Sequence, residues 1–130
     1  MNVLLIKPEF DAPLVAPHLG LGYLSASLKQ AGHKVKVLDG FREKITYTPE
    51  DWNLVGITAM STYFPELCKE VEKAKSYGLK TIIGGAHVIC DPGRSLIDSG
   101  ADYAAAGEGE RTITQLASGR DPSQVEGLYY

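Results

Sequence analysis

The chain has 130 residues, of which 44% are hydrophobic and 22% charged, and its formal net charge is −3. This length and balance are typical of one globular domain that buries its own core. The small negative charge and the scattered basic residues exclude a basic surface for nucleic acid or for an anionic membrane.

The first third of the chain predicts a strand, a helix and a second strand. An apolar strand is expected over 3–6, and a proline-rich loop follows over 9–17. Apolar positions recur at helical spacing over 19–31, where Gly32 ends the helix, and a second strand is expected over 35–38. This is the strand–helix–strand unit of a parallel sheet.

The rest of the chain continues the alternation. The expected elements are a strand over 54–58, a helix from Pro65 to Gly78, a strand over 81–83, a short helix over 91–97, a weaker strand over 101–105 and a helix over 107–119. The residues 127–130 resemble the opening of a further strand. We therefore expect the chain to be a fragment whose next domain is missing.

The stretch from Lys80 to Val88 contains the clearest sign of a binding edge. Its apolar run ends in Gly84 and Gly85, which predicts a buried strand followed by a loop without side chains. Two consecutive glycines allow a large flat ligand to approach the backbone, although a tight turn would explain them too. In open α/β sheets, ligands bind at this carboxyl edge.

Alternating strands and helices, with an apolar run in nearly every strand, indicate a parallel sheet covered on both faces. Five strands in this length match the flavodoxin-like (Rossmann-like) doubly wound α/β fold, with three layers and strand order 2-1-3-4-5. The loops at 7–20, 58–62, 84–90 and 106–110 are then expected to meet on one rim.

A dinucleotide is the first ligand that the pattern suggests. Gly20, Gly22 and Ser25 open a helix, and Asp39 closes the second strand about 20 residues later. The dinucleotide fingerprint needs its first glycine directly after the first strand, whereas some 13 residues separate Ile6 from Gly20. This spacing argues against a dinucleotide.

Other common ligands and sites fit no better. The chain has no GxxxxGK[ST] motif, and Thr58 stands where a phosphoacceptor domain would have an aspartate. The loop after the first strand lacks the hydroxyls that flavin mononucleotide would need. Cys68 and Cys90 have no spacing typical of zinc or an iron–sulfur cluster. No apolar run has the length of a signal peptide or a membrane span, so we expect a cytoplasmic protein.

Five short segments, taken in their order along the chain, resemble segments of a known protein family. They are Leu19 to Leu24, Ala31 to Asp39, Val55 to Met60, Gly84 to His87 and Gly107 to Glu110, with Gly127 to Tyr129 after them. Together they resemble the N-terminal cobalamin (B12)-binding domain of class B radical S-adenosylmethionine (SAM) enzymes. The match runs over almost the entire chain.

The resemblance implies a domain whose rim holds cobalamin against a following barrel with a CxxxCxxC motif. That motif is absent here, so the 4Fe-4S cluster, SAM and the catalytic residues would belong to another part of a methyltransferase-like parent. The fragment itself would not be catalytic. We expect residues 1–126 to form the cobalamin-binding domain and 127–130 to begin the linker or strand into the barrel.

The resemblance also implies which residues contact the cofactor. In the wider class, a hydroxyl-bearing element and a downstream glycine pair cradle the nucleotide tail, and 58–60 and 84–85 occupy those places. The implied cofactor-binding residues are Gly20, Gly22, Thr58, Ala59, Met60, Ser61, Gly84, Gly85, Ala86, His87, Gly107, Glu108 and Gly109. His87 has two roles open to it: contact with cobalamin, or hydrogen bonds to carbonyls of its own loop.

One element of the class is missing. The DxHxxG element that supplies the lower axial histidine does not follow the first strand: His18 lies in that loop, but Ala16 and Leu21 replace the aspartate and glycine. An imidazole without a carboxylate to orient it is a poorer ligand. We expect base-off binding without a protein histidine on cobalt, and no metal ligand in the chain.

Two other functions stay open. The chain could be a degenerate domain of the same fold that binds no cobalamin and serves as a docking or dimerisation surface, and an apolar rim could pair two copies weakly. The missing DxHxxG element favours this alternative, whereas Thr58, the glycine pair and His87 oppose it. A nucleotide-binding regulatory domain rests on fold analogy alone.

Overall fold

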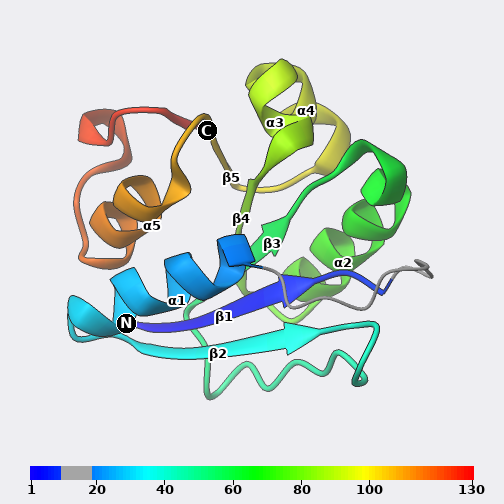
Figure 1. Ribbon diagram of the computed structural model, residues 1–130, viewed down its shortest axis with the longest axis horizontal. Coiled ribbons are helices and arrows are strands. Elements are labelled where there is room, and N and C mark those ends of the chain that lie inside the picture. Colours follow the sequence, from blue (N-terminus) through cyan, green and yellow to red (C-terminus); the bar gives the residue numbers. More distant parts are fainter. Residues whose placement is uncertain (10–18) are drawn as a thin grey trace.

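The computed structural model describes residues 1–9 and 19–130, which form a six-stranded sheet with helices on both faces (Figure 1). The strand order is β2-β1-β3-β4-β5-β6, and every pair is parallel except β5 with β6. The strands are β1 (Asn2–Lys7), β2 (Lys34–Asp39), β3 (Leu54–Thr58), β4 (Lys80–Gly84), β5 (Tyr103–Ala105) and β6 (Leu128–Tyr129).

The helices connect these strands in the doubly wound pattern. They are α1 (Leu19–Gln30), α2 (Phe64–Ser76), α3 (Ala86–Cys90), α4 (Pro92–Ser99) and α5 (Gly109–Ala117), with single 3₁₀ turns η1 (Ser61–Tyr63) and η2 (Pro122–Gln124). None of the helices in the described ranges has the length and hydrophobicity needed to cross a membrane. The predicted α/β fold and the order 2-1-3-4-5 are confirmed.

The two faces of the sheet have separate cores. Helices α1 and α5 lie side by side on one face, and α2, α3 and α4 lie on the other (Figure 1). Because side chains alternate along a strand, Val3 and Leu5 of β1 point to the α1–α5 face, whereas Leu4 and Ile6 point to the opposite face. All four are fully buried, which is typical of a central parallel strand.

The sheet has one strand more than the five predicted. Gly127, at φ +77°, turns the chain after η2, and the Ala106 N–H donates a hydrogen bond to its carbonyl at 2.8 Å. Leu128 then packs against the α1–α5 core, so the end of the chain adds the short antiparallel strand β6. The suggestion of a further strand over 127–130 is therefore correct, but this strand belongs to the same sheet.

The expected loop over 84–90 contains the short helix α3. Gly85, at φ +115°, redirects the chain, and the N–H groups of Val88 and Ile89 donate to its carbonyl at 3.1 and 3.2 Å. Val88 is fully buried on the α2 side of the sheet. Five residues are too few to show helical periodicity in a sequence.

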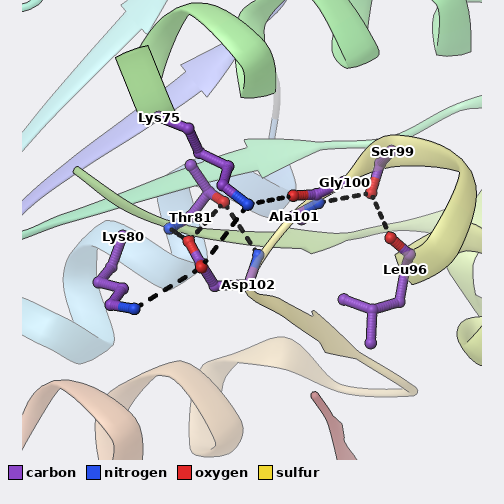
Figure 2. Close-up of polar contacts among 8 residues, drawn as sticks. All are labelled: Lys75, Lys80, Thr81, Leu96, Ser99, Gly100, Ala101 and Asp102. Carbon is purple, nitrogen blue, oxygen red and sulfur yellow. Dashed lines mark hydrogen bonds and ion pairs between the residues drawn. The ribbon is translucent and has the colours of Figure 1, made fainter. Parts of the chain in front are cut away.

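At the amino-terminal edge of the sheet, Asp102 links β4 to the segment before β5 (Figure 2). Its carboxylate accepts hydrogen bonds from the Thr81 N–H at 2.9 Å and from the Thr81 hydroxyl at 3.1 Å. The ammonium groups of Lys75 and Lys80 lie 3.8 and 3.7 Å from the other carboxylate oxygen. This polar cluster holds the edge opposite to the one where ligands are expected.

Candidate functional site

A pocket of about 230 Å³ opens at the carboxyl edge of the sheet, between α1 and α5. We call it the first pocket. Its floor is formed by residues of β1, β3, β4 and β5 that point to the α1–α5 face. Its sides come from the first two turns of α1 and α5. The floor residues are Leu5, Gly56, Thr58, Ile82, Gly84 and Ala105.

The pocket exists because these floor residues become small toward the ends of the strands. Gly56 lies further from the strand ends. A Cβ there would lie 2.8 Å from Leu5 Cδ2 and 3.4 Å from Ile113 Cδ1, so side chains already fill the space beside Gly56. At the end of β4, a Cβ on Gly84 would meet only Ala105, at 3.8 Å. The space that a larger residue at position 84 would occupy is therefore part of the pocket.

The ends of β3 and β4 are held together beside this pocket. The Ala59 N–H donates to the Gly84 carbonyl at 2.6 Å, and the His87 N–H donates to the Ala59 carbonyl at 3.1 Å. A Cβ on Gly85 would lie 2.7 Å from that same Ala59 oxygen. Gly85 is therefore required by the backbone itself, whatever the ligand.

Thr58 places a hydroxyl in a mostly apolar pocket. It is buried at the end of β3, and its side chain interacts with the Tyr63 phenol. Burial raises the pKa of the Tyr63 phenol above its ordinary value, and the interaction with Thr58 offsets part of the rise. The pair thus provides a neutral polar group where a heterocyclic nitrogen could form a hydrogen bond.

His87 is held on the other side of the rim. Its Nδ1 lies 3.0 Å from the Ser61 hydroxyl, and its ring stacks on Phe64 with 4.0 Å between centroids. The side chain is half-buried and does not line the first pocket. Its side-chain partners are therefore a hydroxyl and an aromatic ring, rather than loop carbonyls.

The structure brings together seven of the thirteen implied residues in the first pocket: Gly20, Thr58, Gly84, Gly85, Gly107, Glu108 and Gly109. The others lie beside it. Ala59 is buried between the strand ends, and Met60, Ser61, Ala86 and His87 lie along the neighbouring rim. Gly22 lines a second pocket on the other side of α1.

Three of the four segments expected on one rim contribute to the first pocket, and so does the end of the fourth. That fourth segment, 7–20, lies largely outside the described residues, and so do Ala16 and His18. Within residues 1–9 and 19–130, no three His, Cys, Asp or Glu side chains are arranged to hold a metal ion.

Sequence reasoning missed the apolar part of the lining. These residues are Leu5, Leu21, Leu24, Ile57, Ile82, Ile83, Ala105 and Ile113, together with Gly56 and Glu110. Most of them look like ordinary core positions in a sequence. A glycine in the middle of the apolar run 54–58 was the one available signal, because glycine in a central strand often marks a close approach.

A doubly wound sheet with a pocket at its carboxyl edge defines a Rossmann-like ligand-binding domain. The model of the B12 binding domain family matches residues 10–117, which is most of the chain. The chain therefore belongs to the B12 binding domain family, and the resemblance seen in its sequence is confirmed.

Two curated relatives are methyltransferases. The chain is 29% identical to an uncharacterized methyltransferase of Pyrococcus horikoshii, across 100% of this chain and 32% of the relative. It is also 29% identical to the cytidylyl-2-hydroxyethylphosphonate methyltransferase of Streptomyces wedmorensis, across 86% of this chain and 27% of that protein. The chain thus spans about a third or less of the length of these relatives.

Solved structures share the fold. The radical SAM methyltransferase TsrM of Kitasatospora setae, with cobalamin and a [4Fe-4S] cluster bound, matches with a TM-score of 0.83 and 23% identity, across 98% of this chain and 28% of TsrM. The cobalamin-dependent SAM radical enzyme OxsB matches with a TM-score of 0.71 and 18% identity, across 99% of this chain and 20% of OxsB.

Proposed function

We propose that this chain is the cobalamin-binding module of a radical SAM enzyme, and that it binds cobalamin base-off with the nucleotide tail in the first pocket. The supporting observation is the pocket itself, about 230 Å³ of space lined mainly by apolar side chains and backbone. This volume lies below the range of roughly 300–1,000 Å³ typical of sites for drug-sized ligands. It suits the flat base of the tail and not the corrin ring.

The lining residues suggest how the tail would be held. The side chains of Leu5, Leu24 and Ile82 offer apolar contact to a flat ring, and Gly84 leaves room for it. Thr58 offers a hydroxyl to a nitrogen of the base. Cobalamin, when bound, supplies a cobalt centre that can hold a methyl group.

The missing DxHxxG element, in which Ala16 and Leu21 replace the aspartate and the glycine, supports base-off binding without a protein ligand on cobalt. The chain has 3 histidines. His33 lies at the opposite edge of the sheet, where its ring nitrogens contact the Met1 amine at 3.1 Å and the Ser118 hydroxyl at 3.1 Å. His87 lies on the rim, where its ring contacts the Ser61 hydroxyl and stacks on Phe64, and His18 lies outside the described residues.

The activity of the parent protein is part of this proposal. The names of the relatives and the short share of their length that this chain covers support a methyltransferase. In this methyltransferase, residues 1–126 would form the cobalamin module. Residues 127–130, whose strand β6 extends the sheet of the module, would lead on toward a barrel that binds a 4Fe-4S cluster and SAM. The barrel would be the partner in cis, with catalysis outside this module.

Retention of hydroxocobalamin tests the proposal. The purified chain is mixed with hydroxocobalamin and desalted, and the visible spectrum of the protein fraction is recorded. We expect cobalamin to co-elute with a base-off spectrum. Gly84→Leu fills the first pocket and should weaken retention at least about tenfold, because the base would lose its apolar contacts. The matched control Gly93→Leu changes α4 on the other face, and should retain cobalamin.

Three results would contradict parts of the proposal. Equal retention by a folded Gly84→Leu variant would place the tail elsewhere. Nitrogen superhyperfine splitting in the electron paramagnetic resonance spectrum of the cobalt(II) form would show an axial nitrogen. Colourless wild-type protein, both as this chain and joined to its barrel, would favour the docking-domain alternative.

A further inference from the structure

One carboxylate oxygen at the carboxyl edge of the sheet is buried without a hydrogen-bond partner. It is Oε2 of Glu66, a half-buried residue in the first turn of α2. Within residues 1–9 and 19–130, this atom is shielded from solvent and accepts no hydrogen bond. Buried polar side-chain atoms usually have a partner, because an unpaired polar group in the protein interior is costly. The Glu66 carboxylate therefore indicates a missing hydrogen-bond donor.

The start of α2 favours a carboxylate at this position even without a cation. The unpaired N–H groups of a first helical turn carry partial positive charge, which stabilises an acidic side chain there. No lysine or arginine in the described part of the chain forms an ion pair with Glu66. A neutral N–H donor is therefore sufficient to complete the surroundings of this carboxylate.

The carboxylate lies on the side of α2 that faces β1. Glu70, one turn further along the same side, accepts the Tyr47 hydroxyl at 2.6 Å, and Tyr47 belongs to the same core as Ile6 of β1. On the opposite side of α2, the Cys68 thiol contacts the carbonyl of Asp98 in α4 at 3.8 Å. Because α4 packs on β5, that opposite side faces away from β1.

The β1 side of α2 borders the point where the winding of the sheet reverses. The strands β1 and β3 are paired, and the helices that follow them, α1 and α2, lie on opposite faces (Figure 1). Ligands of open α/β sheets bind in the crevice at such a point. Tyr63, just before α2, interacts with Thr58 of the first pocket, and Glu66 follows Tyr63 by about one helical turn. The carboxylate thus lies beside the first pocket without lining it.

We propose that the Glu66 carboxylate accepts a hydrogen bond from a propionamide side chain of the corrin ring of cobalamin. This inference rests on the proposed function. With the base of the tail in the first pocket, the lower face of the ring would lie over the rim beside it. The propionamide groups project from that face, and each primary amide has two N–H donors. Because hydrogen bonds to a carboxylate are strong, Glu66 would fix the orientation of the ring on the rim.

A metal ion is a poorer match for this carboxylate than an amide. Protein sites for hard cations use several oxygen ligands. In the described ranges, no three His, Cys, Asp or Glu side chains are arranged to hold an ion. A single carboxylate suits one or two N–H donors instead.

Three probes separate the ring from the tail on the 130-residue chain. They are hydroxocobalamin, cobinamide, which keeps the corrin ring but lacks the nucleotide, and ribazole phosphate, which is that nucleotide. Glu66→Gln keeps the shape of the side chain and removes its charge. We expect it to weaken cobinamide and hydroxocobalamin at least about fivefold and to leave ribazole phosphate unchanged. The matched control Glu72→Gln changes an exposed residue of α2 and should bind all three probes like the wild type.

A second set of probes changes the charge on the ligand. In the b-, d- and e-monocarboxylic acids of cobalamin, a carboxylate replaces one propionamide. One of the three should bind the wild type at least about tenfold more weakly than hydroxocobalamin does, because two carboxylates would meet. Glu66→Gln should recover most of this loss for the same acid, because its amide N–H groups donate to the ligand carboxylate. A purely structural role of Glu66 gives no such recovery.

Urea unfolding without ligand is the control for the fold. Glu66→Gln should unfold at the same urea concentration as the wild type or at a higher one, because it removes a buried charge that has no partner. If the variant is less stable but binds cobinamide like the wild type, Glu66 supports the fold and the inference is wrong.

The outcomes separate the two proposals. If the wild type binds hydroxocobalamin and all three acids equally well, Glu66 meets no propionamide and the inference is wrong, although the proposed function stands. If Glu66→Gln weakens ribazole phosphate as much as cobinamide, the variant acts on the tail rather than on the ring, which also contradicts the inference. If the wild type binds neither hydroxocobalamin nor cobinamide, both proposals fail.

Discussion

At the scale of single residues, Gly84 and Gly85 follow one another but have different reasons to be glycine. Gly84 has space on its pocket side, where a Cβ would be 3.8 Å from its nearest neighbour. Gly85 has φ +115°, and a Cβ there would approach the Ala59 oxygen to 2.7 Å. The first glycine leaves volume for a ligand, and the second allows the turn into α3.

This difference predicts unequal effects of alanine on stability. Gly85→Ala should lower the free energy of unfolding by about 1–3 kcal/mol, because the added Cβ meets both an unfavourable φ and a backbone oxygen. The neighbouring Gly84→Ala, the matched control, should change it by less than about 1 kcal/mol, since its Cβ makes an ordinary contact. Urea unfolding followed by circular dichroism measures both. Equal stability of the two variants would mean that the turn at Gly85 relaxes without cost.

At the scale of elements, the two edges of the sheet have different roles. The amino-terminal edge has the Asp102 cluster, which joins β4, the end of α2 and the segment before β5 (Figure 2). The carboxyl edge has the small residues and the two pockets. The polar cluster thus links elements at one edge of the sheet, and the unfilled space lies at the other edge.

Removal of the Asp102 carboxylate should therefore destabilise the fold. Asp102→Ala leaves the buried Thr81 N–H and hydroxyl without their acceptor, and it should lower the free energy of unfolding by about 2–3 kcal/mol. Asp98→Ala is the control. The Asp98 carboxylate pairs with the exposed Arg94, so its loss should cost less than about 1 kcal/mol. Urea unfolding of both variants compares them. A similar small loss in both would show that Asp102 is no more important than a surface pair.

At the scale of the whole molecule, the cores on the two faces share one sheet, and the ligand would bind against that sheet. A ligand that binds only the folded state stabilises all of it. Hydroxocobalamin at 100 times its dissociation constant should raise the free energy of unfolding by about 2.7 kcal/mol. The gain should disappear in Gly84→Leu and persist in Gly93→Leu. Urea unfolding with and without hydroxocobalamin measures this difference. If saturating hydroxocobalamin leaves the free energy of unfolding of the wild type unchanged, the ligand does not bind the native state specifically.

The sequence by itself determined the order of the elements, the doubly wound sheet and the edge that holds the pockets. Apolar runs such as 54–58 and 81–83, ended by glycine or hydroxyl-bearing residues, reflect local rules that act along the chain. The order of five short segments was also enough to indicate the family, which the match over residues 10–117 confirms. These features depend on residues close to one another in the chain.

Only the tertiary structure decided which small residue leaves a space and which charges meet. Gly56, Thr58, Gly84 and Ala105 surround one pocket because β3, β4 and β5 lie side by side. Lys7 meets Asp39 because β1 and β2 pair in one register, although 32 positions separate them. Such distances are set by the packing of segments remote in sequence. Local patterns do not encode these distances, so the sequence could mark the binding edge but not the shape of its pockets.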